Sequence, residues 1–392
     1  MTRRTGFGKL IMLTTIAMAG GRTSPAADWS GALDAGASVA YLKNPTLTPD
    51  VDTYDELGQL TLGADTRAQT ERSRFSLTLR FAALRYRHDK DLDINTGSLD
   101  AGYEDKLERG LWTVNVQALT DSTVTSELGS TGITGINRRH YSGVASSSYQ
   151  YSMSERLSWQ LRGSWSTNRY SNAKQFSLTD SDYTSVQAGP FWNLTEHVQT
   201  SLLLETDRTS PQNRSAQKDY SAFLQVRHTL SERYAWHASA GATRIDPGSS
   251  AKTTTTVFEL GASRHAENVQ WNLEIRRAVL PVGFGLLTRQ DQASLSLTTR
   301  PSEHGTLSLT VTALRSDPVT TFFYLLPGIG VHLQLYSGAT SENASAEWRL
   351  DLTPRWALSA SYDLARAQAG RGRQWADGNQ ARLGILWQSA RT

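Results

Sequence analysis

Hydrophobic and polar residues alternate along most of this chain after residue 27. The apolar residues take every second position from Trp112 to Ala118, from Leu157 to Ser166, from Val269 to Arg276 and from Trp356 to Tyr362. Successive side chains of a β-strand point to opposite faces, so this period of two predicts strands with one apolar and one polar face. Each run has about ten residues, which is enough for a tilted strand to cross a membrane.

The alternating runs predict an all-β fold, a transmembrane antiparallel β-barrel of about eighteen strands, with sixteen as the alternative count. Closure is expected because an open edge in hydrocarbon would leave a row of backbone N–H and C=O groups without partners. The expected strands span 30–41, 57–66, 73–86, 96–105, 110–121, 138–151, 155–170, 181–193, 197–209, 217–229, 232–246, 252–264, 267–279, 290–300, 303–315, 341–352, 355–366 and 377–388.

Short polar turns recur at a steady interval. Their glutamates, Glu155, Glu196, Glu232, Glu267 and Glu303, are separated by 41, 36, 35 and 36 residues. An interval near 36 residues fits one hairpin with its loops, so these turns are expected on the same side of the membrane. The intervening connections are longer and richer in Gly, Ser, Asn and Thr, which is typical of the outer side of outer-membrane barrels.

Tryptophan placement supports this orientation. Nine of the eleven tryptophans lie near a short turn or a chain end and are expected to form one girdle at the membrane interface. These nine are Trp29, Trp112, Trp159, Trp192, Trp236, Trp271, Trp348, Trp356 and Trp387.

Residues 1–27 have the pattern of a secretory signal peptide, and 28–392 are expected to form a single barrel domain. Arg3, Arg4 and Lys9 precede the apolar stretch from Leu10 to Ala19, which is too short to span a bilayer as a helix. This segment carries four basic residues and no acid, so its removal changes the formal charge from +3 to −1. The basic balance therefore gives no reason to expect nucleic acid as a partner.

The remaining composition narrows the chemistry. The chain contains no cysteine, which excludes disulfides and Cys-based metal sites. The eight histidines are dispersed, and no metal-ligand spacing or Gly-rich phosphate loop occurs. We therefore expect no enzyme, no cofactor, no metal and no bound nucleotide. The mean hydropathy of −0.44 remains compatible with a barrel, because only alternate residues face lipid.

If the apolar parity faces lipid, the opposite parity faces the lumen. A polar channel for a hydrophilic solute is one interpretation of the charged residues on this parity, and ion pairs that only satisfy buried charge are the alternative. Their signs are mixed, so they predict no strong preference for anions or cations. The candidate lumen-lining residues are Arg74, Arg80, Arg162, Glu205, Arg227, Glu259, Glu274, Arg276, Glu347, Arg349, Asp363 and Arg382.

Two connections on the long-loop side are apolar, at 278–287 and 320–336. Because apolar loops in bulk water are unfavourable, these segments are expected to fold inward, form a constriction or embed in lipid. One hypothesis makes Phe322, Phe323 and Tyr324 a gate or a sugar-stacking lining. The alternative is that they extend strands beyond the membrane and pack on each other.

From Trp112 to Arg156 the sequence resembles the β-barrel porin 2-like outer-membrane family found beside exopolysaccharide and exosortase (PEP-CTERM) gene clusters. The resemblance covers about fifty residues by motif. A departure is the ending Ser-Ala-Arg-Thr, which lacks a terminal aromatic residue and weakens the expected recognition by the barrel-assembly machinery. The motifs are Asp121-Ser122-Thr123, Ser126-Glu127-Leu128, Thr131-Gly132, Arg138-Arg139, Tyr149-Gln150-Tyr151 and Ser154-Glu155-Arg156, with Asn44-Pro45-Thr46-Leu47 earlier.

The predicted barrel implies a location in the bacterial outer membrane, and the resemblance implies a role in exopolysaccharide export. Transport would be passive, since nothing in the sequence binds nucleotide. The implied partners are outer-membrane lipid, a polysaccharide substrate, periplasmic synthesis or export proteins and the barrel-assembly machinery. Two alternatives remain at this point: a general or solute-selective diffusion porin, and a structural or adhesive barrel that only displays its loops.

Overall fold

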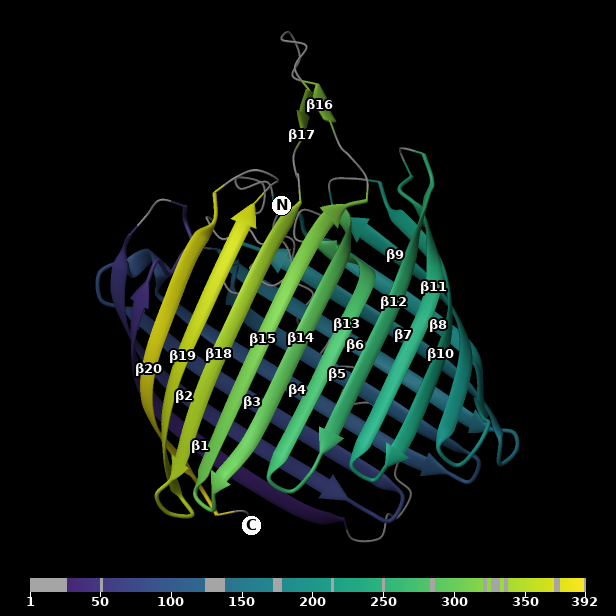
Figure 1. The fold of residues 1–392 in the computed structure, drawn as a ribbon, viewed down its shortest axis with the longest axis horizontal. Coiled ribbons are helices and arrows are strands. Elements are labelled where there is room, and N and C mark those ends of the chain that lie inside the picture. Colours follow the sequence, from purple (N-terminus) through teal and green to yellow (C-terminus); the bar gives the residue numbers. More distant parts are fainter. Residues whose placement is uncertain are drawn as a thin grey trace, which may run out of the picture.

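The computed structural model describes residues 27–49, 52–123, 138–171, 178–212, 215–248, 251–282, 286–319, 323–325, 332–334, 338–369 and 374–390. Eighteen strands form one antiparallel sheet that closes into a barrel, and a separate two-stranded hairpin stands above its rim (Figure 1). No helix in the described ranges is long and apolar enough to cross a membrane. The expected signal segment lies outside the described residues, apart from residue 27.

Each barrel strand pairs with its neighbour in the sequence, except that β15 pairs with β18. The strands are β1 (Asp28–Lys43), β2 (Tyr54–Gln69), β3 (Ser73–Tyr86), β4 (Ile94–Leu107), β5 (Gly110–Ser122), β6 (Arg139–Ser152), β7 (Leu157–Tyr170), β8 (Ser181–Asn193), β9 (Val198–Pro211), β10 (Gln217–Ser231), β11 (Tyr234–Asp246), β12 (Thr253–His265), β13 (Val269–Val282), β14 (Leu286–Ser302), β15 (Gly305–Pro318), β18 (Ala339–Asp351), β19 (Trp356–Ala369) and β20 (Ala376–Gln388); the hairpin above the rim is β16 (Phe323–Leu325) with β17 (His332–Gln334), and η1 (Lys90–Leu92) is a 3-10 turn.

The first and last strands close the barrel. β1 pairs with β20 from Asp34 opposite Gln388 to Lys43 opposite Asn379. With this pairing the barrel sheet has no free edge, so the backbone groups of every spanning strand find partners within the sheet. The predicted count of eighteen strands is confirmed, and the alternative count of sixteen is wrong.

Large apolar side chains cover the outer face of the barrel. Leu60, Leu224 and Leu383 are 62%, 57% and 64% exposed, and other exposed leucines follow the same parity on neighbouring strands. An exposed apolar surface of this extent is not compatible with water but is required in lipid. The chain is therefore a transmembrane β-barrel of the bacterial outer membrane.

Aromatic residues mark the boundary of the lipid-facing surface at the short-turn end. Trp112 and Trp159 lie on the outer face near their turns, and Trp356 is directly opposite Trp387. Trp29, beside the start of β1, is 65% exposed. An indole ring in this position lies in lipid while its N–H remains near water, so these residues fit the predicted interfacial girdle.

Hydroxyl side chains set the shape of the short turns. Ser154 Oγ accepts hydrogen bonds from the backbone N–H groups of Arg156 and Leu157 at 3.3 and 3.1 Å. Thr195 and Thr353 repeat this arrangement in the turns after β8 and β18. Ser and Thr form such turns because a short side chain replaces a backbone acceptor. Glu155 and Glu196 follow Ser154 and Thr195 directly, whereas Thr353 is followed by Pro354.

The apolar segment 278–287 differs from the expectation of an inward-folding loop. Residues 278–282 continue β13, and 286–287 begin β14, with Pro281 opposite Leu287 in the register. The two strands thus extend past the membrane and pair with each other. The described part of this segment is therefore strand and not an inward-folding loop, because its continuous pairing satisfies the backbone within the sheet; residues 283–285 lie outside the described residues.

A new charge should destabilise the barrel more on the outer face of a strand than on its inner face at the same depth in the membrane. Leu224 lies at the middle of β10 on the lipid face, whereas Gln225 beside it lies on the inner face. We expect Leu224→Arg to destabilise the barrel by about 2–4 kcal/mol, because the guanidinium must enter hydrocarbon. Gln225→Arg is the matched control and should cost less than about 1 kcal/mol. Denaturant unfolding in phospholipid vesicles measures both, and equal costs would contradict the assigned faces.

Candidate functional site: the polar lumen wall

The cross-strand register places the twelve predicted lumen residues on one face of the sheet, opposite to the large exposed apolar residues. Arg276, for example, is opposite Glu259 on β12 and Gln292 on β14, while the flanking Ile275 faces lipid. A role of these side chains in permeation remains a prediction. The residues concerned are Arg74, Arg80, Arg162, Glu205, Arg227, Glu259, Glu274, Arg276, Glu347, Arg349, Asp363 and Arg382.

One cluster of charges joins the first three strands. Arg80 lies 3.4 Å from Asp34 and 2.8 Å from Asp65, so one guanidinium is shared by two carboxylates. Thr78 also donates its hydroxyl to Asp65 at 2.7 Å. These side chains are about one third exposed to the lumen, so water screens the pairs and their net electrostatic contribution is modest. The cluster carries an excess of one negative charge.

Gly63 leaves space for this cluster because it has no side chain. A Cβ atom at Gly63 would lie 2.3 Å from Oδ1 of Asp34, which is closer than real Cβ contacts come. Gly63 is directly opposite Asp34 on β1 and Arg80 on β3. The carboxylate therefore folds over a position without a side chain, and this keeps it beside the arginine.

A second polar chain runs across β11 to β14. His237 Nε2 lies 2.7 Å from Glu259, and Gly261 leaves the space that the imidazole ring occupies. Arg276 donates two hydrogen bonds to Gln292, at 3.0 and 2.7 Å. It also lies 3.7 Å from Glu274 on its own strand. Charge and amide groups thus alternate around this part of the wall.

Acidic residues gather on the inner face of β9 and β10. Glu205 accepts hydrogen bonds from Ser185 at 2.7 Å and Gln187 at 3.2 Å. Asp207 and Asp219 are directly opposite each other and are 6% and 3% exposed. Together they line a hollow of about 270 Å³ that also contains Glu259 and Arg276. In the described ranges no group of three or more acidic or histidine side chains is arranged to hold a metal ion.

The remaining charges lie on strands next to the β1–β20 seam or near the short-turn end. Glu347, Asp363 and Arg382 line a hollow of about 350 Å³ together with serines of β19. Arg349 pairs with Asp351 at 2.9 Å. Arg74 donates to Gln69 at 3.4 Å. In the register Arg162 is flanked by Ser148 and Gln187, and Arg227 is flanked by Gln199 and His237.

The inner face of β14 is polar along the spanning part of the strand. Gln290, Gln292, Ser294, Ser296 and Thr298 occupy successive inward positions. Opposite them β15 supplies Thr312, Thr310 and Ser308, and Thr298 lies 3.4 Å from Ser308. Hydroxyl and amide groups therefore form a neutral hydrogen-bonding path from the short-turn end toward the loop end.

The connection after β1 folds over the lumen wall. Leu47 packs with Ala367 of β19 and Ala376 of β20, both inward positions, and is 6% exposed. Asn44 donates its side-chain amide to the backbone carbonyl of Asp377 at 3.0 Å. Asn44 and Leu47 both adopt positive φ angles, 49° and 47°, which turn the chain back on itself. This inward element was not predicted from the sequence. The apolar segments 278–287 and 320–336 were expected to fold inward instead.

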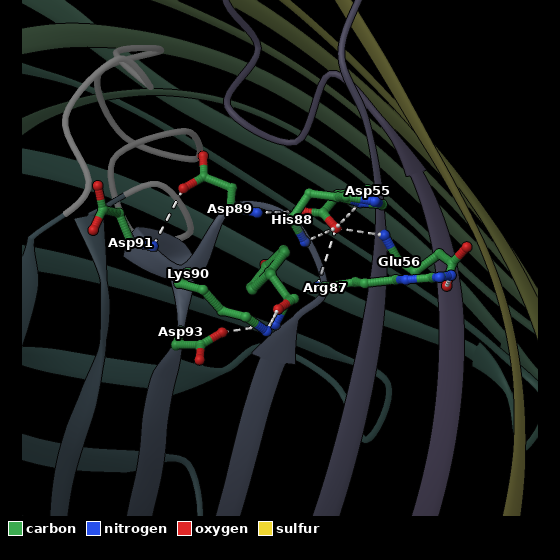
Figure 2. A network of polar contacts seen from close by, with 9 residues as sticks. Asp55, Glu56, Arg87, His88, Asp89, Lys90, Asp91 and Asp93 are labelled. Atoms are coloured by element: carbon green, nitrogen blue, oxygen red, sulfur yellow. Dashed lines mark hydrogen bonds and ion pairs between the residues drawn. The ribbon is translucent and has the colours of Figure 1, made fainter.

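The connection from β3 to β4 is tied to β2 by one buried carboxylate (Figure 2). Asp55 accepts backbone hydrogen bonds from Glu56, Arg87, His88 and Asp89, at 2.7, 3.2, 3.0 and 2.9 Å. Converging backbone N–H groups form a site that favours a carboxylate. Asp55 therefore holds this connection at the rim of the lumen.

A surface ion pair lies beside this network. Arg87 bonds the carboxylate of Glu56 at 2.8 Å, which raises the pKa of the Arg87 guanidinium above its ordinary value. Lys90 also donates to the backbone carbonyl of Tyr86.

The proposed gate residues are only partly described. Phe323 and Tyr324 lie in β16, which pairs with β17 above the rim of the barrel (Figure 1). Phe322 lies outside the described residues. A gate or sugar-stacking role for these three aromatic residues stays a prediction.

Several acidic and histidine partners were not singled out in the sequence, although the same alternation places them inward. Asp34 and Asp65 contact Arg80, and His237 contacts Glu259. His140 contacts Asp121 at 2.9 Å and stacks on Tyr170 near the loop end. Counting every charged residue of the inward parity, rather than the most regular runs alone, finds all of them.

No family model matches this chain, and no curated protein matches it. Its fold is similar to three Pseudomonas aeruginosa crystal structures. OccK5 (OpdH) is 11% identical over 93% of this chain and 99% of that chain, with a TM-score of 0.46. OpdQ is 9% identical over 92% and 99%, with a TM-score of 0.46. OccK2 (OpdF) in complex with glucuronate is 12% identical over 92% and 98%, with a TM-score of 0.46.

At these identities the likeness concerns the barrel alone. The closed sheet, the apolar exterior and the charged interior define a porin-like outer-membrane β-barrel. The expected association with exopolysaccharide and exosortase gene clusters finds no support in these comparisons.

The glycine beneath Asp34 gives a direct test of the first cluster. We expect Gly63→Ala to destabilise the barrel by about 1–3 kcal/mol, because the new methyl group displaces the Asp34 carboxylate from Arg80. Gly163→Ala is the matched control, since no atom lies within 4 Å of its added Cβ, and it should stay within about 0.5 kcal/mol of the parent. Urea unfolding of the refolded protein in vesicles compares the two. A Gly63→Ala variant as stable as the control would show that Asp34 is not held in this position.

Proposed function

We propose that this barrel is a passive channel for small hydrophilic solutes in the outer membrane. The observation that carries the proposal is the neutral polar path on the inner faces of β14 and β15, which continues across the lipid-facing band. A barrel that served only to display loops would not require hydrogen-bonding groups along the whole spanning height. A solute moving through water in the lumen would exchange weak hydrogen bonds along this path.

The size of the barrel supports the same proposal. Eighteen tilted strands spaced about 4.8 Å apart give a barrel about 35 Å across between backbones. Inward side chains of ordinary length do not fill a tube of this width, and barrels of similar strand number leave an aqueous channel. The connection at Leu47 packs on inward positions of β19 and β20 near the loop end, where it would narrow the mouth of the lumen. Selectivity for small solutes is consistent with such a narrowing.

Export of an exopolysaccharide is a finer version of this function, implied by the family resemblance in the sequence. The hydroxyl and amide groups of β14 and β15 suit weak contacts with sugars, but they suit other polar solutes equally well. Nothing on the described inner face is specific to a polymer, so we place polymer export second. Polymer block of the channel distinguishes the two.

Planar-bilayer recording of the purified protein tests the proposal. We expect a steady single-channel conductance. It should fall when neutral sugars enter the lumen, and sugars of increasing size are tested in turn. A long exopolysaccharide added to one side should block only weakly if small solutes are the substrates, whereas strong block by the polymer would favour export. Absence of conductance at every voltage would overturn the channel proposal.

The shared arginine of the first cluster predicts the ion selectivity of the channel. Arg80→Gln removes the guanidinium shared by Asp34 and Asp65, so we expect the permeability ratio of K⁺ to Cl⁻ to rise about two- to threefold. Asp34→Asn combined with Asp65→Asn should shift the ratio in the opposite direction. Reversal potentials in a KCl gradient measure both changes. Shifts of the same sign in both variants, or none, would place this cluster outside the ion path.

A further inference from the structure

The outer face of β9 to β12 carries an excess of positive charge near the loop end. Arg208, Lys218 and Arg244 all belong to the outward parity and are exposed. Lys252 lies directly before β12 and pairs with Asp246 at 2.8 Å. Asp246 is the only acid in this group, which we name the basic sector: Arg208, Lys218, Arg244, Asp246 and Lys252. Its net charge is therefore positive.

Two cations of the basic sector face each other directly. Arg208 and Lys218 are cross-strand partners, and like charges in this position repel. Lys218 is also opposite Asp246 on β11, but the Asp246 carboxylate is engaged by Lys252. No ion pair or hydrogen bond of the Arg208, Lys218 or Arg244 side chains occurs among the described residues. An anion between these side chains would remove the repulsion.

Several arginines elsewhere near this rim pair with an acid of the protein, although Arg85 on β3 bonds only backbone carbonyls and the Asn95 side-chain oxygen. Arg169 binds Asp182 at 2.7 Å on β7 and β8. On β13 to β15, Arg277 binds Asp291 at 2.5 Å, and Asp317 lies 2.9 Å from Arg289 and 3.0 Å from Arg315. The basic sector differs from these paired arginines because Arg208, Lys218 and Arg244 have no acid within ion-pair distance among the described residues.

The height of the basic sector identifies the kind of partner. Tyr220 is directly opposite Arg244 on the outer face, and Leu204 and Leu224 lie below it on the apolar surface. A tyrosine bordering an apolar band marks the level of lipid headgroups. The loop end of an outer-membrane barrel faces the outside, where the outer leaflet is built from phosphorylated glycolipids. Basic clusters at headgroup level bind anionic lipid.

We propose that Arg208, Lys218 and Arg244 bind a phosphate group of an outer-leaflet glycolipid. Side chains directly opposite or diagonal in a sheet lie about 5–8 Å apart at Cβ, so three long cationic side chains can reach one phosphate. Guanidinium groups bind phosphate oxygens in pairs, and a lysine adds a further donor. The acyl chains of the same lipid would cover the leucines below.

Native mass spectrometry of the refolded barrel in detergent tests this proposal. The probes are bisphosphorylated lipid A, lipid A without its phosphates, and inorganic phosphate. For Arg208→Gln/Lys218→Gln/Arg244→Gln we expect the apparent Kd for bisphosphorylated lipid A to rise at least about tenfold. The matched control, Arg277→Gln/Arg289→Gln/Arg315→Gln, removes the same number of cations from a paired sector and should change the Kd less than about twofold.

The other probes decide the source of the phosphate. Lipid A without phosphates should bind weakly to parent and variants alike. Equal binding of the two lipids, or unchanged binding by the β9–β11 variant, overturns the proposal. Inorganic phosphate that binds as tightly as the lipid would assign the site to free phosphate and also overturn it. Heat-dependent gel migration verifies that each variant is folded before its affinity is compared.

Discussion

Every feature of this barrel depends on the need to satisfy backbone hydrogen bonds in hydrocarbon. The pairing of β1 with β20 meets this need, because it removes the two edges that an open sheet would expose to lipid. Once the sheet is closed, each strand has only two environments, lipid outside and the lumen inside. The alternation of side chains then assigns every spanning residue to one of them. A single-residue slip between two strands would exchange these environments and is strongly disfavoured.

The same constraint explains how charges are distributed inside. A charged side chain on the inner face keeps contact with water, so pairs such as Arg80 with Asp65 need not be neutral as a group. The clusters on β1–β3, β9–β14 and β18–β20 therefore carry different local balances of charge, and the first and third share hollows beside the β1–β20 seam. Their rotational positions follow from strand order alone. A solute crossing the lumen would meet carboxylates on one side and neutral hydroxyl groups on another.

The sequence predicted the strands well because lipid and water impose a period of two that few other constraints disturb. The expected spans 73–86 and 181–193 coincide with β3 and β8. The partners of the lumen charges were harder to predict, since Asp34 and Arg80 meet across two strand pairings whose register the pattern does not specify. The segment 278–287 was predicted to be a loop because apolar loops and apolar strand extensions have the same composition. The inward turn at Leu47 depends on a tertiary contact with β19 and β20 that leaves no periodic signal.

Pairing at the outer rim obeys a different rule from pairing inside. A charge on the lipid side has water on one side only, so an acid on the neighbouring strand is the simplest partner, as between Arg169 and Asp182. Where no acid is supplied, the headgroups of the surrounding lipid become the nearest anions. The basic sector on β9 to β12 and the paired sector on β13 to β15 thus represent two solutions to one problem of charge at a membrane boundary. The first solution makes the stability of the rim depend on the lipid around it, whereas the second makes the rim independent of that lipid.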